Sequence, residues 1–406
     1  MKNVVTGLDV GTDTIRVVVT SFASSAKDGA VRPEIMAAVS HPSRGMRHGY
    51  VKDVSDVSSA IAEAIAKAEK IAGFRIKEVF LGIGGISVES SIINSSVAIA
   101  SGERVVSAED LRRLKELSEK SINERKNREI LHAIPLGYKL DGHHLYARPL
   151  GMEGSQLASK THYITVLKQH FEDIVSSVEK AGLKVDDVAV SVLGTSMVAL
   201  TKAHKTAGCL LANLGAETVS LIVFEENLPI SVATFQIGGT SITNDLALGL
   251  KVPIEEAESI KLSKERLTTA QAKKKIDEII GARLKDIFEA VGVYLRKLGK
   301  DGLLPAGIVL TGGTSSIDGI ELLAKSSLLL PSRRLISLTP PRSGTPLHKD
   351  TASPRSAESE KGVGYATAYG LTLIGQSKGT DEESMGMDRE QSFANTLLSW
   401  FKQFLP

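Results

Sequence analysis

Apolar side chains recur every three to four residues in several stretches of the chain, which places them on one face of an α-helix. These stretches predict helices over 57–71, 108–122, 171–181 and 272–298. Ser107 precedes the second stretch, and acidic residues follow it directly. This arrangement is typical of a helix N-terminus, because a hydroxyl caps free N–H groups and acids favour the positive end of the helix dipole.

A second pattern occurs twice: an apolar strand, a tight turn with glycine and hydroxyl or acidic side chains, and another apolar strand. The copies are 4–20, VVTGLDVGTDTIRVVVT, and 207–224, AGCLLANLGAETVSLIVF. Such turns expose several backbone N–H groups, which suits a phosphate. Two copies about two hundred residues apart indicate a duplicated α/β domain. In 305–320, PAGIVLTGGTSSIDGI, a strand runs through glycines into a helix, and anions are favoured at such a helix N-terminus.

The end of the chain combines a polar lead with a short amphipathic segment. Residues 377–391 are acidic and polar and predict a flexible linker, whereas 392–406 predicts a helix with one apolar face. The apolar face comprises Phe393, Leu397, Leu398, Trp400, Phe401, Phe404 and Leu405. We expect this helix to bind a membrane surface; the alternative is docking on the protein's own body or in a neighbour's groove. Lys402 is its only cation, so one tail binds lipid weakly and assembly multiplies the affinity.

Composition excludes several classes of protein. The net charge is +2, with 42% hydrophobic and 24% charged residues, so no basic field indicates nucleic-acid binding. Cys209 is the only cysteine, which excludes an internal disulfide and fits a reducing cytoplasm; we expect it to be a buried small hydrophobe. The N-terminus lacks the features of a signal peptide, and no window reaches the ~18 apolar residues of a membrane span. Residues 338–360 are rich in proline, serine and charge and predict a solvated excursion.

Taken together, these segments resemble the actin/Hsp70/sugar-kinase ATPase superfamily, and within it the FtsA family of bacterial cell-division proteins. The more specific likeness is carried by five runs in the expected order: FLGIGGISVESS, ILHAIPLGYKLDG, RPLGMEGSQL, FQIGGTSITNDLALGL and AESIKL. The resemblance implies an α/β, two-lobed, actin-like ATPase fold of duplicated ribonuclease-H-like domains, with an inserted 1C subdomain and a C-terminal amphipathic helix.

The same resemblance implies a division of the chain into subdomains. The insertion, SHS2-like in character, is expected at 81–159. The remaining ranges are 1–80, 160–203 and 361–376 for subdomain 1A, 204–238 and 305–360 for 2A, and 239–304 for 2B, followed by the linker 377–391 and the helix 392–406.

In the first turn, the resemblance implies that Asp9 holds Mg²⁺, through its waters, and that the residues after it wrap the β- and γ-phosphates of ATP. Those residues are Gly11, Thr12, Asp13 and Thr14. A single carboxylate fits Mg²⁺, which prefers one or two carboxylates plus phosphate and water. The alternative for this segment alone is an ordinary β-turn with a surface acid.

The second turn departs from the family pattern. Where relatives usually have Asp-Ile-Gly-Gly-Gly-Thr, this chain has Asn213, Leu214, Gly215, Ala216, Glu217 and Thr218. Asn213 removes a charge that would orient metal-bound or attacking water. Ala216 and Glu217 are expected to resist a left-handed backbone, and Glu217 to bring a negative charge toward a negative ligand. We therefore expect weak or absent ATP hydrolysis and weakened nucleotide binding.

The adenosine is expected at Gly312, Gly313 and Thr314. Glu258 and Lys261 lie three residues apart on one helical face and would reach the ribose and base; the alternative is an exposed ion pair. Gly238 and Gly239 are expected to be structural glycines at the hinge between 2A and 2B, with a possible phosphate contact.

Two further sets of residues complete the predictions. Arg283 and Asp286 match the place where the family holds the C-terminal peptide of the tubulin-like protein FtsZ, with solvated surface charges as the alternative. His143 and His144 have no third ligand nearby and are expected at the surface rather than in a metal site.

The leading hypothesis is an actin-like adaptor that tethers FtsZ filaments to the cytoplasmic face of the inner membrane at the division site. It would assemble with itself, use ATP and Mg²⁺ as conformational ligands, bind lipid through its tail and recruit downstream division proteins through 1C, without binding nucleic acid. Two alternatives remain open: a sugar kinase of the same superfamily, and a pilus-assembly adaptor of the PilM type.

Overall fold

The computed structural model describes residues 3–24, 31–100, 104–123, 127–145, 147–262, 270–336, 338 and 362–385. The predicted excursion 338–360, apart from Leu338, and the predicted C-terminal helix 392–406 lie outside the described residues.

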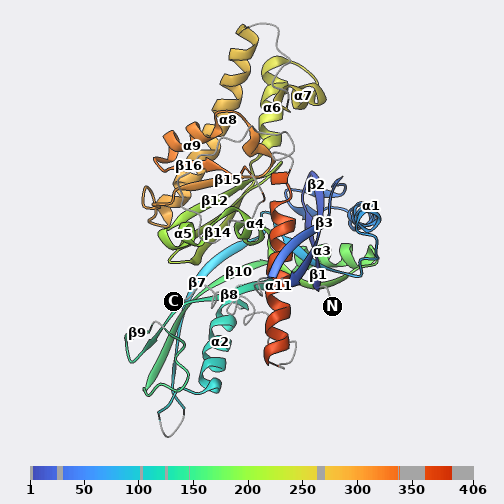
Figure 1. Cartoon of the computed structure of the whole chain (residues 1–406). Helices are drawn as coiled ribbons and strands as arrows, with labels where there is room; N and C mark the ends of the chain where they lie inside the picture. The colour runs from blue at the N-terminus through green and yellow to red at the C-terminus, as the bar shows by residue number, and fades with distance from the viewer. Residues whose placement is uncertain are drawn as a thin grey trace.

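Two five-stranded sheets form the two lobes, and they have the same topology (Figure 1). Their strand orders are β3-β2-β1-β6-β11 and β14-β13-β12-β15-β16. In each sheet three antiparallel strands from two consecutive hairpins are extended by two parallel strands. The first sheet comprises β1 (Asn3–Val10), β2 (Thr14–Ser24), β3 (Val31–Pro42), β6 (Glu78–Ile83) and β11 (Lys184–Val190). The second comprises β12 (Cys209–Leu214), β13 (Val219–Glu225), β14 (Leu228–Phe235), β15 (Ile308–Thr311) and β16 (Ser332–Arg334). This equivalence confirms the predicted duplication.

Helices cover and connect the lobes. In the first lobe they are α1 (Val54–Ala72), α3 (Lys168–Lys180), α4 (Ser191–Ala199) and α11 (Ala366–Met385). In the second lobe they are α5 (Lys202–Ala207), α6 (Gly239–Leu250), α7 (Ile254–Leu262), α8 (Ala270–Lys297), the 3-10 turn η1 (Gly313–Ser316) and α9 (Ile320–Leu328). Helix α4 contacts β6 and β11 of the first sheet and also β12 and β13 of the second, so it joins the lobes. Two short strands, β4 (Met46–Arg47) and β5 (Tyr50–Val51), form a hairpin beside the first sheet.

The predicted helices are confirmed, with ends shifted by a few residues. Helix α1 shows why such predictions succeed: its apolar stripe, which includes Val57, Ile61 and Ala64, is fully buried. The Asp53 carboxylate accepts from the N–H groups of Ser55 and Asp56, which caps the first turn. These determinants are local in the chain, so they can be identified without knowing the fold.

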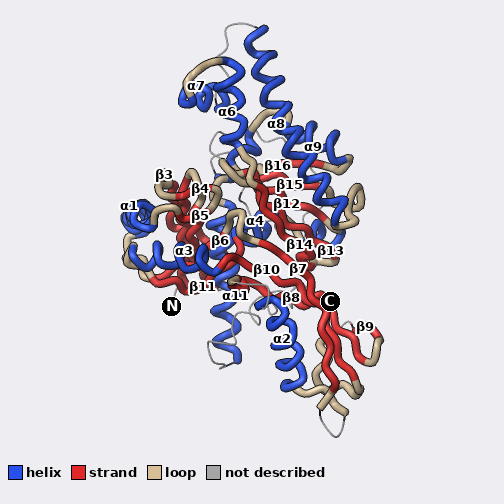
Figure 2. Tube along the Cα trace, turned by 180° about the vertical axis from the view of Figure 1, so that it is seen from behind, coloured by secondary structure: helices blue, strands red, loops and turns tan. Residues whose placement is uncertain are grey.

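The inserted subdomain projects from the end of the molecule opposite α6 and α7 (Figure 2). Its antiparallel sheet has the order β7-β10-β8-β9, and α2 packs on β7 and β10. The elements are β7 (Glu89–Ala98), α2 (Ala108–Asn123), β8 (Arg128–Leu140), β9 (His143–Leu145) and β10 (Gln156–Leu167). Its core is small and separate, built from Val97, Val106, Leu114, Leu140 and Leu157.

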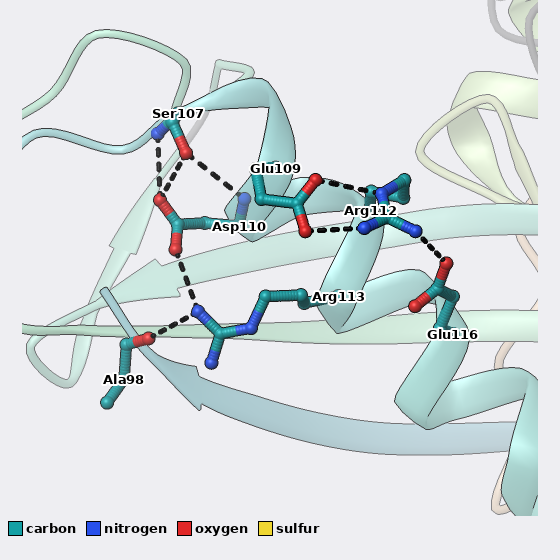
Figure 3. Close-up of polar contacts among 7 residues, drawn as sticks. All are labelled: Ala98, Ser107, Glu109, Asp110, Arg112, Arg113 and Glu116. Atoms are coloured by element: carbon teal, nitrogen blue, oxygen red, sulfur yellow. Dashed lines mark hydrogen bonds and ion pairs between the residues drawn. The ribbon is translucent and has the colours of Figure 1, made fainter. Parts of the chain in front are cut away.

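The N-terminus of α2 has the predicted cap (Figure 3). The Ser107 hydroxyl accepts from the N–H of Asp110 at 3.2 Å, and the Asp110 carboxylate accepts from the Ser107 N–H at 3.0 Å. Asp110 is fully buried and also accepts from Arg113, which reaches the carbonyl of Ala98 on β7. Hydrogen bonds from Ser107 hold the pKa of Asp110 below its usual value. The cap therefore also ties α2 to the sheet.

Two predicted boundaries of the insertion are wrong. The limit at 80/81 falls inside β6, whose apolar run is buried in the first sheet between β1 and β11. The limit at 159/160 falls inside β10, which pairs with both β7 and β8 from Leu157 to Thr165. In both cases the residue pattern does not change at the boundary, because one continuous strand crosses it. The insertion therefore begins after Ile83 and its sheet extends to Leu167.

The predicted linker is also partly wrong, because α11 continues to Met385 and includes residues 377–385. The buried segment of this helix, including Ala368 and Leu371, packs against α4, β1 and β2. Once that segment is helical, adding further turns costs little, since nucleation is the expensive step. A polar composition therefore does not prevent helical structure here.

Candidate functional site

The two hairpin turns face a common cleft of about 1120 Å³ between the lobes. The first turn connects β1 to β2, and the second connects β12 to β13. A Cβ at Gly11 would lie 2.7 Å from the carbonyl oxygen of Thr14, and one at Gly215 would lie 3.0 Å from that of Thr218. The two turns are therefore close-packed in equivalent ways, as the repeated pattern predicts.

The structure brings almost all predicted nucleotide-binding residues to this cleft. Those that line it are Asp9, Gly11, Thr12, Asp13, Thr14, Gly215, Ala216, Thr218, Gly239, Glu258, Lys261, Gly312, Gly313 and Thr314, together with Asn213. Glu217 and Gly238 are the two that do not line it. The contacts of these residues with a nucleotide stay a prediction, but their convergence from five separate parts of the chain provides one continuous surface.

Asp9 lies at the floor of the cleft, near the end of β1. Its cross-strand partner is Arg16, and the Ser191 hydroxyl at the start of α4 donates to its carboxylate at 3.5 Å. Burial raises the pKa of Asp9, and the charge of Arg16 and the hydrogen bond from Ser191 lower it in part. A nearby cation would stabilise the charged form of this buried carboxylate. Among the described residues no group of three potential ligands gathers. The Asp9 carboxylate is a donor of the type that Mg²⁺ binds, because Mg²⁺ takes one or two carboxylates and completes its shell with phosphate and water.

The second turn is held from behind by the start of α6 and by η1. The carbonyl oxygen of Gly215 accepts from the N–H of Gly239 at 3.0 Å and from the Thr314 hydroxyl at 2.9 Å. A Cβ on Gly238 would lie 2.5 Å from the carbonyl oxygen of Ala216. The φ of −173° at Gly238 is extended backbone that any residue adopts, so its conformation does not require glycine. Glycine is required here because a side chain would not fit. This supports the structural role expected for the glycine pair.

The expected strain in the second turn is wrong. No positive φ occurs at Gly215, Ala216 or Glu217, so the turn accommodates both non-glycine residues without a left-handed backbone. The expected direction of Glu217 is wrong as well, because its side chain does not line the cleft. Its carboxylate instead accepts from the backbone N–H of His48 at 2.6 Å, in the other lobe. Asn213 is packed beside Gly312, where a Cβ would lie 2.4 Å from its Oδ1 atom.

Glu258 and Lys261 lie together on α7 at the cleft, and their contact with a nucleotide stays a prediction. They form an ion pair of 2.6 Å, and both line the cleft. The Lys261 ammonium also donates to the Thr243 hydroxyl at 2.9 Å and to the carbonyl oxygen of Gly239 at 3.2 Å. Two of these three contacts, those with Thr243 and Gly239, connect α7 to α6. Its side chain is 10% exposed and that of Glu258 is 42% exposed, so Glu258 is the more accessible of the two.

Arg283 and Asp286 lie together on α8, and neither lines the cleft. The guanidinium of Arg283 makes two hydrogen bonds to the Asp245 carboxylate, at 2.6 and 2.9 Å, and lies 3.3 Å from Asp286. The bidentate pairing with Asp245, on α6, was not predicted. A partner's acidic group would have to compete with Asp245 for this arginine.

The remaining predictions concern residues outside the cleft. Cys209 is fully buried, as expected, and burial raises the pKa of its thiol to about 12. His143 and His144 are exposed on β9, also as expected. Across the described residues, no helix is both long and apolar enough to cross a membrane.

Comparison with known proteins identifies the family. Residues 87–165 match the family described as the SHS2 domain inserted in FtsA, and residues 210–370 match the family described as cell division protein FtsA. The chain is 30% identical to cell division protein FtsA of Pseudomonas aeruginosa, over 94% of this chain and 92% of that protein. This chain belongs to the FtsA family of cell-division proteins.

Solved structures confirm the fold expected of an FtsA protein. The PilM-PilN type IV pilus biogenesis complex aligns with a TM-score of 0.67 at 18% identity, covering 91% of this chain and 98% of that chain. MreB5 of Spiroplasma citri bound to AMPPNP aligns with a TM-score of 0.50 at 12% identity, covering 95% and 100%. The fold is therefore actin-like, and it is shared with a protein that was solved with a bound nucleotide.

The lining of the cleft in this FtsA protein also includes residues that were not predicted from the sequence, among them Arg16, Ser191 and Asp277. Arg16 could have been found, because it faces Asp9 across the hairpin when the register is counted from the turn. Ser191 and Asp277 carry no local signal, since tertiary packing alone brings α4 and α8 to the cleft.

Proposed function

We propose that this FtsA protein binds MgATP between its lobes as a conformational ligand and links FtsZ filaments to the cytoplasmic face of the inner membrane at the division site. The observation that carries the nucleotide proposal is the placement of both hairpin turns and the glycines around Gly312 on one cleft. The FtsA family supports the division role. The PilM likeness concerns the fold alone, whereas both family matches, including that of the insertion, favour FtsA.

In this proposal each part of the cleft has a separate task. Asp9 holds Mg²⁺ through its waters, and the N–H groups and hydroxyls of the two turns bind the phosphates. Arg16 adds positive charge beside them, and Glu258 binds the ribose. When bound, Mg²⁺ neutralises phosphate charge. The protein groups fix the angle between the lobes around the ligand, and that angle controls assembly into filaments.

Slow hydrolysis follows from Asn213. This residue occupies the position in the second lobe that Asp9 occupies in the first, two residues before the turn glycine. An amide can hydrogen-bond to a water molecule but does not accept its proton at neutral pH. The site therefore favours binding over turnover, which suits a ligand that acts by shifting a conformational population.

Attachment to the membrane is proposed from the sequence of 392–406, with its apolar face against lipid. Arg283 and Asp286 are the proposed binding place of the FtsZ peptide. A single short helix buries its apolar side chains only partly at an interface, so its affinity is modest. Assembly of many copies multiplies that affinity. Downstream division proteins would be recruited through the inserted subdomain.

Liposome co-sedimentation tests the tether. Intact protein should pellet with vesicles of phosphatidylethanolamine and phosphatidylglycerol, and Trp400→Glu should abolish pelleting because a charge on the apolar face opposes insertion. Thr396→Glu adds the same charge to the polar face and is the matched control that should still pellet. Lipid binding that survives deletion of 392–406 would rule out the tether. Calorimetry with MgATP tests the cleft separately, and loss of binding in Asp9→Ala is the expected result.

A further inference from the structure

Glu217 and His48 connect the two lobes, and each is adjacent in sequence to residues that line the cleft. The Glu217 carboxylate accepts from the His48 backbone N–H at 2.6 Å and lies 3.4 Å from its Nδ1 atom. The two residues are separated by 169 positions in the chain, and their side chains are 23% and 26% exposed. A charged acceptor with a backbone donor makes a strong hydrogen bond when water is partly excluded.

On the first lobe, His48 belongs to a turn that is fixed against the first phosphate turn. It connects β4 to β5, and the N–H of Gly49 donates to the Thr12 hydroxyl at 3.0 Å. A Cβ on Gly49 would lie 2.3 Å from the Cα of Gly85, so this turn also packs closely on the loop after β6. The next residue, Tyr50, stacks on His170 with 4.6 Å between ring centroids. The donor of the contact is therefore rigidly attached to the first lobe.

On the second lobe, the acceptor is equally well anchored. The carbonyl oxygens of Gly215 and Ala216, just before Glu217, accept from the N–H groups of Gly239 and Thr240 at 3.0 and 2.7 Å. These bonds hold the second phosphate turn on the start of α6. Opening of the cleft would therefore pull Glu217 away from His48, since neither turn can follow the other lobe.

We propose that Glu217 is a latch that holds the two lobes closed without nucleotide. A bound phosphate would bridge the two turns by accepting hydrogen bonds from N–H groups of both. The Glu217 carboxylate is also an anion, and it already accepts one such hydrogen bond from the opposite lobe. Nucleotide then adds to a closed state that exists before it binds, rather than creating it. The effect of nucleotide on the closed state rests on the proposed nucleotide function, whereas the latch itself does not.

Distance measurement between spin labels on the two lobes tests the latch. Lys70→Cys on α1 and Lys274→Cys on α8 provide exposed labelling sites, and Cys209 is fully buried. Without nucleotide, the protein with Glu217 should give one short distance. Glu217→Ala should populate a longer distance, with a change in the open-to-closed ratio on the order of tenfold, the size expected for one charge-assisted hydrogen bond. Glu217→Gln keeps a neutral acceptor and should fall between the two.

Glu256→Gln is the matched control, because it removes the same charge from an exposed position of the second lobe. It should leave the distance unchanged. Residue 217 has no positive φ, so alanine fits the backbone, and circular dichroism confirms that each variant is folded. Identical nucleotide-free distances in the Glu217 variants and the parent protein would overturn the latch.

Addition of MgATP separates the latch from the proposed nucleotide function. If both are right, MgATP restores the short distance in Glu217→Ala. If MgATP leaves the label distance of every variant unchanged, while Glu217→Ala and the parent protein still differ without nucleotide, the nucleotide proposal fails and the latch stands. If all variants are closed without nucleotide, the latch fails whatever MgATP does.

Discussion

Gly370 of α11 crosses Gly194 of α4 so closely that a Cβ on Gly370 would lie 1.8 Å from the Gly194 carbonyl oxygen. A second close approach occurs two residues earlier on α11, where a Cβ on Gly7 of β1 would lie 2.0 Å from the carbonyl oxygen of Ala368. Helix α4 contacts both sheets, so the packing of α11 on α4 helps to set the position of the element that joins the lobes.

Gly370→Ala should therefore destabilise the protein by about 1 to 3 kcal/mol, the usual cost of overpacking a core. The obstacle is backbone rather than a movable side chain, so relief requires a shift of a whole helix. Urea denaturation measures the change in unfolding free energy. Gly281→Ala on α8 is the control, because a Cβ there meets nothing within 4 Å; it should be neutral or stabilising by up to about 1 kcal/mol. Equal effects of the two substitutions would contradict the crowded crossing.

Asn213→Asp should increase ATP hydrolysis, because a carboxylate can take the proton that the amide cannot. We expect turnover to rise roughly tenfold or more, given the size of typical general-base contributions. Release of inorganic phosphate at saturating MgATP is the measurement. Adding Asp9→Asn to this variant should remove the gain by removing the metal's carboxylate. A rate unchanged by Asn213→Asp would mean that residue 213 does not control hydrolysis.

The buried His132 side chain should make the folded protein less stable in mild acid. Burial, with a contribution from His162, lowers the pKa of His132 to about 3, and its Nε2 atom accepts from the Val190 N–H at 3.0 Å. The unfolded chain gains a proton near pH 6.5, but the folded state does not until about pH 3. Stability from this group is therefore complete above pH 6.5 and declines as the pH falls toward 3, by up to about 1.4 kcal/mol per pH unit.

Denaturation at pH 7 and pH 5 measures this loss. His132→Gln retains an acceptor for the Val190 N–H but no titrating group, so it should show a smaller difference between the two pH values. A variant with the same pH dependence as the parent protein would assign the loss to other groups, such as His162, whose pKa burial lowers to about 4.

Asp245→Asn should strengthen binding of the acidic FtsZ peptide, if Arg283 is its anchor. The bidentate pair with Asp245 occupies the guanidinium, and removing that charge frees it. We expect affinity to rise several-fold, and Arg283→Ala to lower it by roughly tenfold or more. Fluorescence anisotropy of a labelled peptide measures both. Lys285→Ala, on the same helix with its side chain 65% exposed, controls for the loss of one positive charge. Tighter binding in Arg283→Ala would contradict the anchoring role.

The sequence alone determined the features that depend on neighbouring residues. The apolar stripe around Ile61 predicted α1, and Ser107 with the acids after it predicted the cap of α2, because these interactions span only a few residues. The repeat of a strand, glycine turn and strand predicted two equivalent hairpins, and their family likeness predicted one cleft that contains Asp9 and Gly312.

Tertiary structure alone decided the features whose partners are distant in the chain. Glu217 contacts the opposite lobe because His48, 169 residues earlier, offers an N–H there. Arg283 is paired because α6 brings Asp245 to α8, 38 residues apart. β6 and β10 cross the expected subdomain limits because continuous strands pair on both sides of them. Local patterns specify which elements form and which residues can do chemistry, whereas the direction of a charged side chain is set by the nearest compatible group that folding brings to it.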